Sequence, residues 1–378
     1  MKISKVEAIP LAIPYNHGGA AARLGEARAG EARAGWGDKM WKALDMVLVR
    51  VETDAGITGW GEAFVYNCRR PVQAAVEDMI APIVLGREAG DVAGLMRELQ
   101  MGLHLFGRYG ITLFALSGLD LALWDIAGKA AGVPVCRLVG GAWRDRIPSY
   151  ASLFRYNDPE VVAERAAAAL AAGYAHIKLH EITLPEVEAA RRTAGDEVPI
   201  MLDTNCPWTP VEAHEMARRL KPLDLYWLEE PIFPPEDFTA LAELQRRSGI
   251  ALAAGENACT GFQFRQMFAA GAVTFAQPSV TKVGGITEFL KVAALAETAG
   301  VAVMPHSPYF GPGWLATLQL MAALPDSGLI ERFYVTPEAS LYGDLINAVE
   351  GHCRVPEDPG LGPDPDPHVI STYRVRGD

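Results

Sequence analysis

The segment Ile200-Met-Leu-Asp203-Thr-Asn205 runs from apolar residues into an acid and an amide. The pattern returns in Leu228-Glu229-Glu230-Pro231 and in Ala254-Gly255-Glu256-Asn257, so that acids at 203, 229 and 256 are separated by 26 and 27 residues. That separation is the length of one strand, one helix and their connections. Because apolar strands that alternate with helices form parallel sheets, we expect the three acids at the same end of three neighbouring strands.

Eight apolar segments of this kind follow the glycine pair at 140–141. The predicted strands are 147–153, 175–180, 199–205, 225–230, 251–257, 273–279, 301–306 and 328–333. The predicted helices between them include 159–172, 210–220, 236–247, 261–270, 286–299 and 313–323. Eight such units predict an α/β fold whose sheet closes into a TIM-type barrel. An open doubly wound sheet is disfavoured because its glycine-rich dinucleotide turn is absent from the sequence.

The chain before the barrel reads as a smaller α+β unit. Strand alternation at 2–9 and a hairpin around Asp54-Ala-Gly56 precede helical periodicity from 71 to 132. We expect an N-terminal α+β capping domain at 1–132 and a (β/α) barrel at 133–335. The Pro- and Asp-rich tail, 336–378, is expected to pack back on the cap.

Composition excludes several classes of protein. The 378 residues carry a net charge of −12 and no run of Lys or Arg, which argues against a nucleic-acid partner. No uninterrupted apolar run approaches the ~18 residues of a membrane span, and the N-terminus reads as a strand. The five cysteines are scattered without paired spacing, as in reduced intracellular proteins. We therefore expect a soluble cytoplasmic protein with no membrane partner.

Converging carboxylates imply a cation. Three acids in a desolvated pocket repel one another, and a hard dication is the simplest compensation. A set of oxygen ligands without Cys or His favours Mg²⁺ over zinc. Any one acid could instead cap the helix that follows its strand.

Other strand ends carry further ionisable side chains. Lys178 and His180 end the second predicted strand, and residues two apart on a strand face the same side. His306 ends the seventh strand and Glu331 lies in the eighth. A lone histidine is more often structural than catalytic, but two histidines facing a group of carboxylates favour catalysis.

The helix Ala115-Leu-Ser-Gly-Leu-Asp-Leu-Ala-Leu-Trp-Asp-Ile-Ala-Gly-Lys129, the motif Leu138-Val-Gly-Gly141 and the strand-end acids resemble the enolase superfamily across nearly the whole chain. The mandelate racemase and muconate cycloisomerase branch is the most similar. The resemblance implies a modified barrel with a cap, a homo-oligomer, and Mg²⁺ bound by Asp203, Glu229 and Glu256. The ion would grip a small-molecule carboxylate substrate and stabilise the enediolate formed by α-proton removal. Strand parity leaves Glu229 and Glu230 open, and the family pattern selects Glu229.

The resemblance also assigns supporting residues. Glu331 matches the acid that hydrogen-bonds the far oxygen of the substrate carboxylate, and Asn205 matches a position supporting the metal ligands. A loop of the cap, here roughly 15–41 and containing the repeat Gly-Glu-Ala-Arg-Ala at 25–29 and 30–34, is expected to lie over the barrel mouth. Its candidate substrate contacts are Tyr15, His17, Arg23, Trp36 and Trp41.

Two departures from the family pattern concern the bases. The second strand usually ends in Lys-x-Lys, whereas this chain has Lys178 and His180, so His180 takes the position of the base. The racemase-like Asp that orients the seventh-strand histidine is replaced by Ser279, in the motif that also contains Lys282. Without that partner, His306 suits proton donation better than proton removal.

We therefore favour dehydration of a sugar acid or hydroxy acid, with His180 as base and His306 as the acid that expels the β-hydroxyl. Racemisation, epimerisation or cycloisomerisation are alternatives that give His306 another role. A Schiff-base aldolase is an alternative that only Lys178 supports. A binding protein without catalysis is another, and its expected mark, the loss of metal ligands, is absent from this sequence. The sequence does not name the substrate.

Overall fold

The structure is a computed structural model that describes residues 1–18, 43–325 and 328–376. Its larger part is a curled sheet of eight parallel strands. In spatial order these are β10 (Ala302–Val303), β9 (Phe275–Ala276), β8 (Leu252–Ala254), β7 (Trp227–Glu229), β6 (Ile200–Asp203), β5 (Ile177–Leu179), β4 (Arg146–Ser152) and β11 (Ile330–Phe333). The two end strands approach each other where the Gly328 amide donates to the Val303 carbonyl at 3.4 Å. The predicted TIM-type barrel is confirmed.

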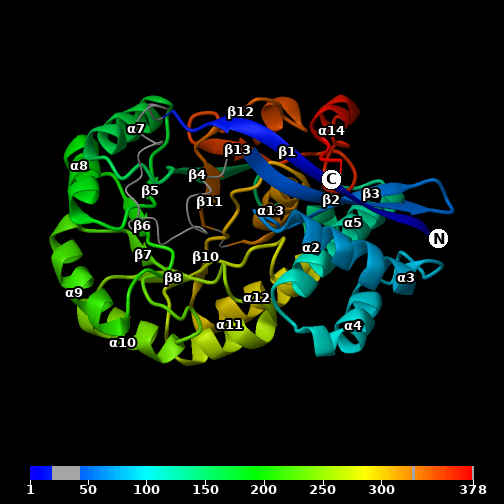
Figure 1. Cartoon of the computed structure of the whole chain (residues 1–378), viewed down its shortest axis with the longest axis horizontal. Helices are drawn as coiled ribbons and strands as arrows, with labels where there is room; N and C mark the ends of the chain where they lie inside the picture. Colours follow the sequence, from blue (N-terminus) through cyan, green and yellow to red (C-terminus); the bar gives the residue numbers. More distant parts are fainter. Residues whose placement is uncertain (19–42, 326–327, 377–378) are drawn as a thin grey trace.

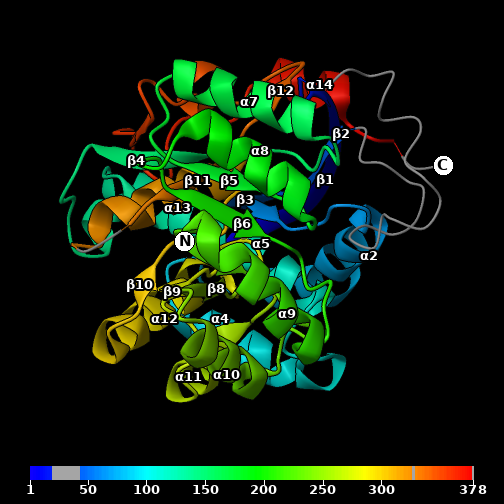
Figure 2. The same ribbon diagram turned by 90° about the vertical axis from the view of Figure 1, so that its left-hand side faces the viewer.

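Helices surround this sheet (Figure 1), and Figure 2 shows α7 and α8 covering β4, β5 and β6. The helices are α7 (Pro159–Ala171), α8 (Leu184–Ala194), α9 (Pro210–Leu220), α10 (Phe238–Ser248), α11 (Thr260–Ala269), α12 (Gly285–Ala299) and α13 (Pro312–Ala323). Local chemistry sets their starts: Thr209 and Glu212 form a reciprocal capping box before α9, and Asp158 and Asp237 accept amide hydrogens before α7 and α10. Most strands are shorter than the predicted apolar segments, whereas β4 has the predicted length with a start one residue earlier.

The smaller part is an antiparallel sheet of β1 (Ile3–Asn16), β2 (Ala43–Thr53) and β3 (Thr58–Ala63), covered by helices. These are α2 (Arg69–Ala74), a π-helical turn (Ala75–Ile80), α3 (Ala81–Val84), α4 (Val92–Gly102), a 3₁₀ turn (His104–Phe106) and α5 (Ile111–Ala131). A short helix, α6 (Val135–Leu138), leads into the barrel. The predicted α+β capping unit is confirmed, although β1 extends to Asn16, beyond the expected end at 9.

Helix α5 packs directly on β3. A Cβ atom at Gly61 would lie 1.9 Å from the Gly118 carbonyl oxygen, so only glycine permits this approach. Within the described part of the chain, α5 alone is long and apolar enough to cross a membrane, but 78% of its most apolar window is buried inside the protein. It is the core helix of the cap.

The C-terminal tail contacts both parts of the molecule. Strand β12 (Thr336–Pro337) pairs with β1, whereas β13 (His352–Arg354) adds to β4 of the barrel. Helix α14 (Pro367–Tyr373) lies beside β1 in Figure 1, and Arg374 forms a bridge with Leu11. Buried Asp125 accepts from the Leu361 amide at 2.8 Å and from the Trp60 amide at 2.9 Å. The division at 132/133 stays a prediction.

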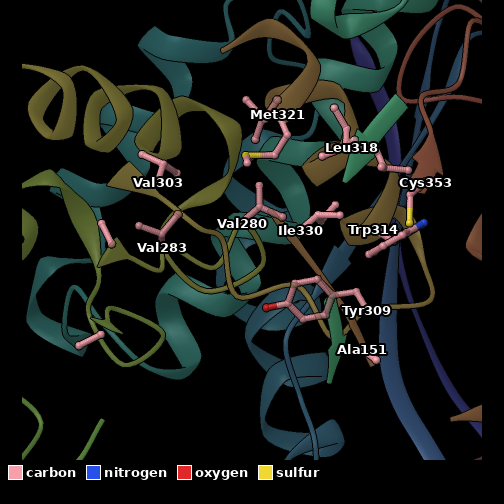
Figure 3. Close-up of a cluster of buried hydrophobic side chains, with 14 of the residues drawn as sticks. Ala151, Val280, Val283, Val303, Tyr309, Trp314, Leu318, Met321, Ile330 and Cys353 are labelled. Carbon is pink, nitrogen blue, oxygen red and sulfur yellow. The ribbon is translucent and has the colours of Figure 1, made fainter. Parts of the chain in front are cut away.

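A buried apolar cluster joins α13 to the barrel wall. Figure 3 shows Trp314, Leu318 and Met321 from α13 near Ile330 of β11, with Tyr309 beneath them. All five side chains are nearly or fully buried. Inside the barrel, a second cluster consists of Tyr150, Met201, Trp227, Ala253, Met304 and Leu329. This packing fixes the strand ends that carry the polar residues.

Glu62 of β3 ties the cap to the barrel. It is 4% exposed and accepts from the Gly313 amide in the first turn of α13 at 2.9 Å. The Gly311 amide, just before that helix, also donates to it. Burial raises the pKa of Glu62 from 4.5 to about 7, although the two amides act in the other direction.

This raised pKa makes the stability of the protein depend on pH. The carboxyl keeps its proton longer when folded, so its contribution is full below pH 4.5 and is lost as pH rises through about 7. Glu62→Gln cannot ionise. Between pH 5 and 7.5, the unfolding free energy of the variant should therefore gain about 2 kcal/mol relative to the natural protein, measured by urea denaturation. If the difference in unfolding free energy between the variant and the natural protein does not change with pH, Glu62 is not buried as described.

Candidate active site

The ammonium of Lys178, on β5, lies among carboxylates from three other strands. Its Nζ is 2.9 Å from Glu331, 3.0 Å from Glu229 and 3.4 Å from Asp203. Lys178 is fully buried. Burial alone would lower the pKa of this lysine, but Glu229 and Glu331 raise it well above its usual value. A lysine that keeps its proton is a poor Schiff-base nucleophile, which argues against the aldolase hypothesis.

Asp203 and Glu229 are register partners on β6 and β7, and their side chains hydrogen-bond each other. Burial and the charge of Asp203 raise the pKa of Glu229 well above its usual value. Burial also acts on Asp203, but Lys178 and His180 outweigh it and lower the pKa of Asp203. Two adjacent carboxyl groups in this buried place do not both ionise readily, because their negative charges repel each other.

The turn after β6 orients Asp203. Asn205 donates to Asp203 Oδ1 from its backbone at 3.0 Å and from its side-chain amide at 2.9 Å. Arg155, which follows β4, donates to the Asn205 side-chain oxygen at 2.9 Å and also to the backbone carbonyl of His180. One guanidinium thus holds the backbone beside both Asp203 and His180.

His180 has a defined orientation. Its Nδ1 lies 2.6 Å from the Leu153 carbonyl oxygen, which can only accept, so Nδ1 carries a hydrogen. Nε2 lies 3.2 Å from Asp203 Oδ2, and the side chain is 18% exposed. When the ring is neutral, its lone pair therefore lies on Nε2, the nitrogen that faces Asp203. This is the geometry required of a general base.

Glu256 lies two residues beyond the end of β8, so the predicted strand 251–257 is too long there. Its Oε2 is 2.6 Å from His306 Nε2. Burial opposes ionisation of Glu256, but His306 and then Lys282 lower its pKa to about 2. Glu256 and His306 form a second pair of ionisable side chains, apart from the contacts of Lys178.

The other ring nitrogen of His306 faces hydroxyl groups. Nδ1 lies 3.2 Å from the Tyr309 hydroxyl and 3.4 Å from Ser279 Oγ, and the two hydroxyls are in close contact. All three residues are buried. Ser279 thus lies beside His306, where the sequence comparison with the racemase-like pattern placed the missing carboxylate.

Glu230 and Lys282 are two further buried ionisable residues near this site. Asn257 donates to Glu230 Oε2 at 2.7 Å and the Cys206 thiol donates at 3.5 Å, while Oε1 is buried with no hydrogen-bond partner among the described residues. Glu230 has a φ of 42°, a strained backbone conformation. The Lys282 ammonium lies 4.6 Å from the centre of the Phe64 ring, a cation–π contact with the cap.

The three predicted metal ligands do not gather into one group here. Across residues 1–18, 43–325 and 328–376, no three His, Cys, Asp or Glu side chains converge as a metal site. Lys178 contacts Asp203 and Glu229, whereas Glu256 turns to His306. The donor chemistry fits a hard dication, because all three predicted ligands are carboxylates that offer oxygen atoms at the barrel mouth.

Aromatic rings form one side of the barrel mouth. The ring of Tyr15 lies 6.4 Å from those of Phe154 and Phe333, and His17 stacks on Phe154 at 4.9 Å. Tyr15 belongs to β1, so the predicted loop starting at 15 begins after Asn16 instead. A cavity of about 40 Å³ lies between this side, β2 and the segment after β10. Arg23, Trp36 and Trp41 lie outside the described residues.

Arg155 and Tyr309 were not identified from the sequence. Arg155 lies two residues past the predicted end of the first barrel strand, so its position at a strand end is a signal in the sequence that could have identified it. Tyr309 follows His306 by three residues, in a turn that no periodic pattern describes.

Comparisons with known proteins agree with this fold and site. Residues 161–369 match the family described as enolase C-terminal domain-like, so the chain is an enzyme of the enolase superfamily. Residues 40–140 match the N-terminal domain of mandelate racemase / muconate lactonizing enzyme, and the chain belongs to that branch.

Named relatives cover most of the chain. Arabinonate dehydratase of Saccharolobus solfataricus is 31% identical over 84% of this chain and 88% of its own length. D-galactarolactone cycloisomerase of Agrobacterium fabrum is 31% identical over 87% of this chain and 91% of its own. A racemase from Streptomyces coelicolor, solved with bound magnesium, is 29% identical with a TM-score of 0.83, covering 99% of this chain and 100% of that one.

The carboxylates around Lys178 generate a stability prediction. Lys178→Met would leave Asp203, Glu229 and Glu331 buried without their shared cation. We expect the metal-free variant to lose about 3–5 kcal/mol of unfolding free energy, measured by urea denaturation. Lys291→Met, which removes a lysine that is 57% exposed, is the matched control and should lose far less. Equal losses would show that the buried ion contacts are not formed.

Proposed function

We propose that the protein is a Mg²⁺-dependent dehydratase of sugar acids or related hydroxy acids, in which His180 removes the proton α to the substrate carboxylate. The contact between His180 Nδ1 and the Leu153 carbonyl at 2.6 Å carries this proposal, because it fixes the hydrogen of the neutral ring on Nδ1 and so makes Nε2 the nitrogen that accepts a proton. The names of the relatives, arabinonate dehydratase among them, support the reaction class.

Asp203, Glu229 and Glu256 would hold the ion. When bound, Mg²⁺ offsets the negative charge that develops on the substrate carboxylate. Lys178 adds a fixed positive charge beside Glu331, next to the carboxylate of the substrate. Asn205 keeps Asp203 in place through its two bonds to Oδ1. The racemase solved with bound magnesium supports this choice of metal.

His180 and His306 would act in sequence. His180 Nε2 takes the α-proton, and its Nδ1–H stays bonded to the Leu153 carbonyl, which stabilises the ring when it becomes charged. His306 then gives its Nε2 proton to the β-hydroxyl, which leaves as water while the electrons of the α-carbon form the double bond. Ser279 and Lys282 support His306 and Glu256. Tyr15, Arg23 and Trp36 are proposed substrate contacts.

Cycloisomerisation is the second candidate, since a cycloisomerase is as similar to this chain as a dehydratase is. The leaving group distinguishes the two. A β-hydroxyl needs a proton from His306 in order to leave, whereas a lactone ring oxygen leaves as part of a carboxylate and needs none. His306→Asn should therefore stop dehydration of a hydroxy acid and spare the opening of a lactone.

The acidic charge of −12 and the free cysteines support a soluble cytoplasmic enzyme that acts on a small molecule, without nucleic-acid or membrane partners. We propose that it forms a homo-oligomer, as the resemblance implies. Light scattering coupled to size-exclusion chromatography measures that assembly.

The role of His180 is tested by hydrogen exchange. The Mg²⁺-loaded protein is incubated in D₂O with arabinonate, galactonate, gluconate, xylonate and galactarolactone, and the α-hydrogen is followed by NMR. We expect exchange or conversion of at least one compound, and His180→Asn should reduce it by ~10²–10⁴-fold. His176→Asn, at the other end of the same strand, is the matched control. Full activity of His180→Asn would disprove the assignment of the base.

The metal site is tested by calorimetry. The protein treated with EDTA should bind Mg²⁺, and Asp203→Asn should weaken that binding at least about tenfold because it removes one charged oxygen ligand. Asp196→Asn changes an exposed acid at the far end of β6 and should bind as the natural protein does. If neither protein takes up Mg²⁺, the proposed metal is wrong.

A further inference from the structure

We propose that Tyr309 is the positioning residue for His306, and that its hydroxyl fixes the imidazole in the place of a carboxylate partner. This inference rests on the proposed function for the role of His306 as the acid. It extends that function by assigning a task to a residue outside the predicted site.

The contacts around His306 limit the hydrogen-bond partners of its Nδ1 atom to two hydroxyl groups. The Tyr309 hydroxyl is 3.2 Å from Nδ1, nearer than Ser279 Oγ at 3.4 Å, and the two hydroxyls bond to each other. Exposure is 4% for His306, 6% for Tyr309 and zero for Ser279, so water does not replace these partners easily. Nε2, on the opposite side of the ring, faces Glu256.

The segment that carries Tyr309 is held on both sides. The Tyr309 amide donates to the Ser307 carbonyl at 2.7 Å, and the Ser307 amide donates to Glu331 Oε2 at 3.1 Å. On the other side, Glu62 of the cap holds the amide of Gly313 at 2.9 Å. Figure 3 shows the Tyr309 ring in the buried cluster, with its hydroxyl directed away from Trp314. The hydroxyl is thus presented to His306 by a rigid backbone.

A hydroxyl partner differs from a carboxylate in charge. Burial raises the pKa of Tyr309, so its hydroxyl stays neutral. It can accept the Nδ1–H of His306 and pass its own hydrogen to Ser279, which fixes the ring without adding negative charge behind it. When His306 gives its Nε2 proton to the leaving hydroxyl, Nδ1–H remains in place and bonded. The Tyr309 hydroxyl therefore holds the His306 ring both before and after the proton transfer.

Tyr309→Phe removes the hydroxyl and keeps the ring. With an acid that the natural protein converts, we expect product formation to fall about 10- to 100-fold, part of the ~10²–10⁴-fold that a general acid contributes. Exchange of the α-hydrogen in D₂O should stay within about threefold, because His180 is untouched. Tyr174→Phe, which changes a buried tyrosine before β5, is the control and should leave both rates unchanged. Equal rates for Tyr309→Phe and the natural protein, or equal loss of exchange and product, overturn the proposal.

A second measurement needs no substrate. ¹⁵N NMR of histidine-labelled protein, with the His306 signals assigned by their loss in His306→Asn, reports which ring nitrogen carries hydrogen. We expect one fixed form in the natural protein and averaged nitrogen signals in Tyr309→Phe. Unchanged signals overturn the proposal. If no acid in the panel reacts with the natural protein, the proposed function fails, while this spectrum still decides the role of Tyr309.

Discussion

The ion contacts between Lys178 and the carboxylates of Asp203, Glu229 and Glu331 are the constraint on which the barrel mouth depends. They join β5, β6, β7 and β11 at one buried point, where each group alone would be too costly to desolvate. A cation placed so deep requires several acids, and several acids require a cation. This mutual need explains why ionisable side chains lie inside the barrel, next to a cluster that consists mostly of apolar side chains.

Around that point the site has two halves with different chemistry. Asp203, Asn205 and His180 form one half, tied together by Arg155 and by the carbonyl of Leu153. Glu256 and His306 form the other, backed by neutral hydroxyls. If Asp203, Glu229 and Glu256 hold one divalent ion, as we propose, that ion would join the two halves.

Much of the fold could be predicted from the sequence because its signal is periodic. Eight apolar segments, each followed by a helical pattern, are enough for a barrel, and the strand-end rule found Lys178, His180 and Asp203. Glu256 shows the limit of that rule, since the chain leaves the strand two residues earlier and the side chain follows the turn toward His306. Arg155 contacts residues 25 and 50 positions further along the chain, and Tyr309 reaches His306 through a turn that has no periodic pattern, so neither role could be predicted from the sequence.

The hydrogen bond that the Gly313 amide donates to Glu62 shows that the cap does more than cover the barrel. The amide that it accepts from lies in the first turn of the helix that follows Tyr309, so the position of the cap and the orientation of the His306 ring depend on one short stretch of backbone. Exchange of caps between related enzymes is therefore constrained. A foreign cap that suited a new substrate but lacked an acid at this position would leave the segment of Tyr309, and with it the His306 ring, less firmly held. Within this lineage, recognition and reactivity are expected to have evolved together.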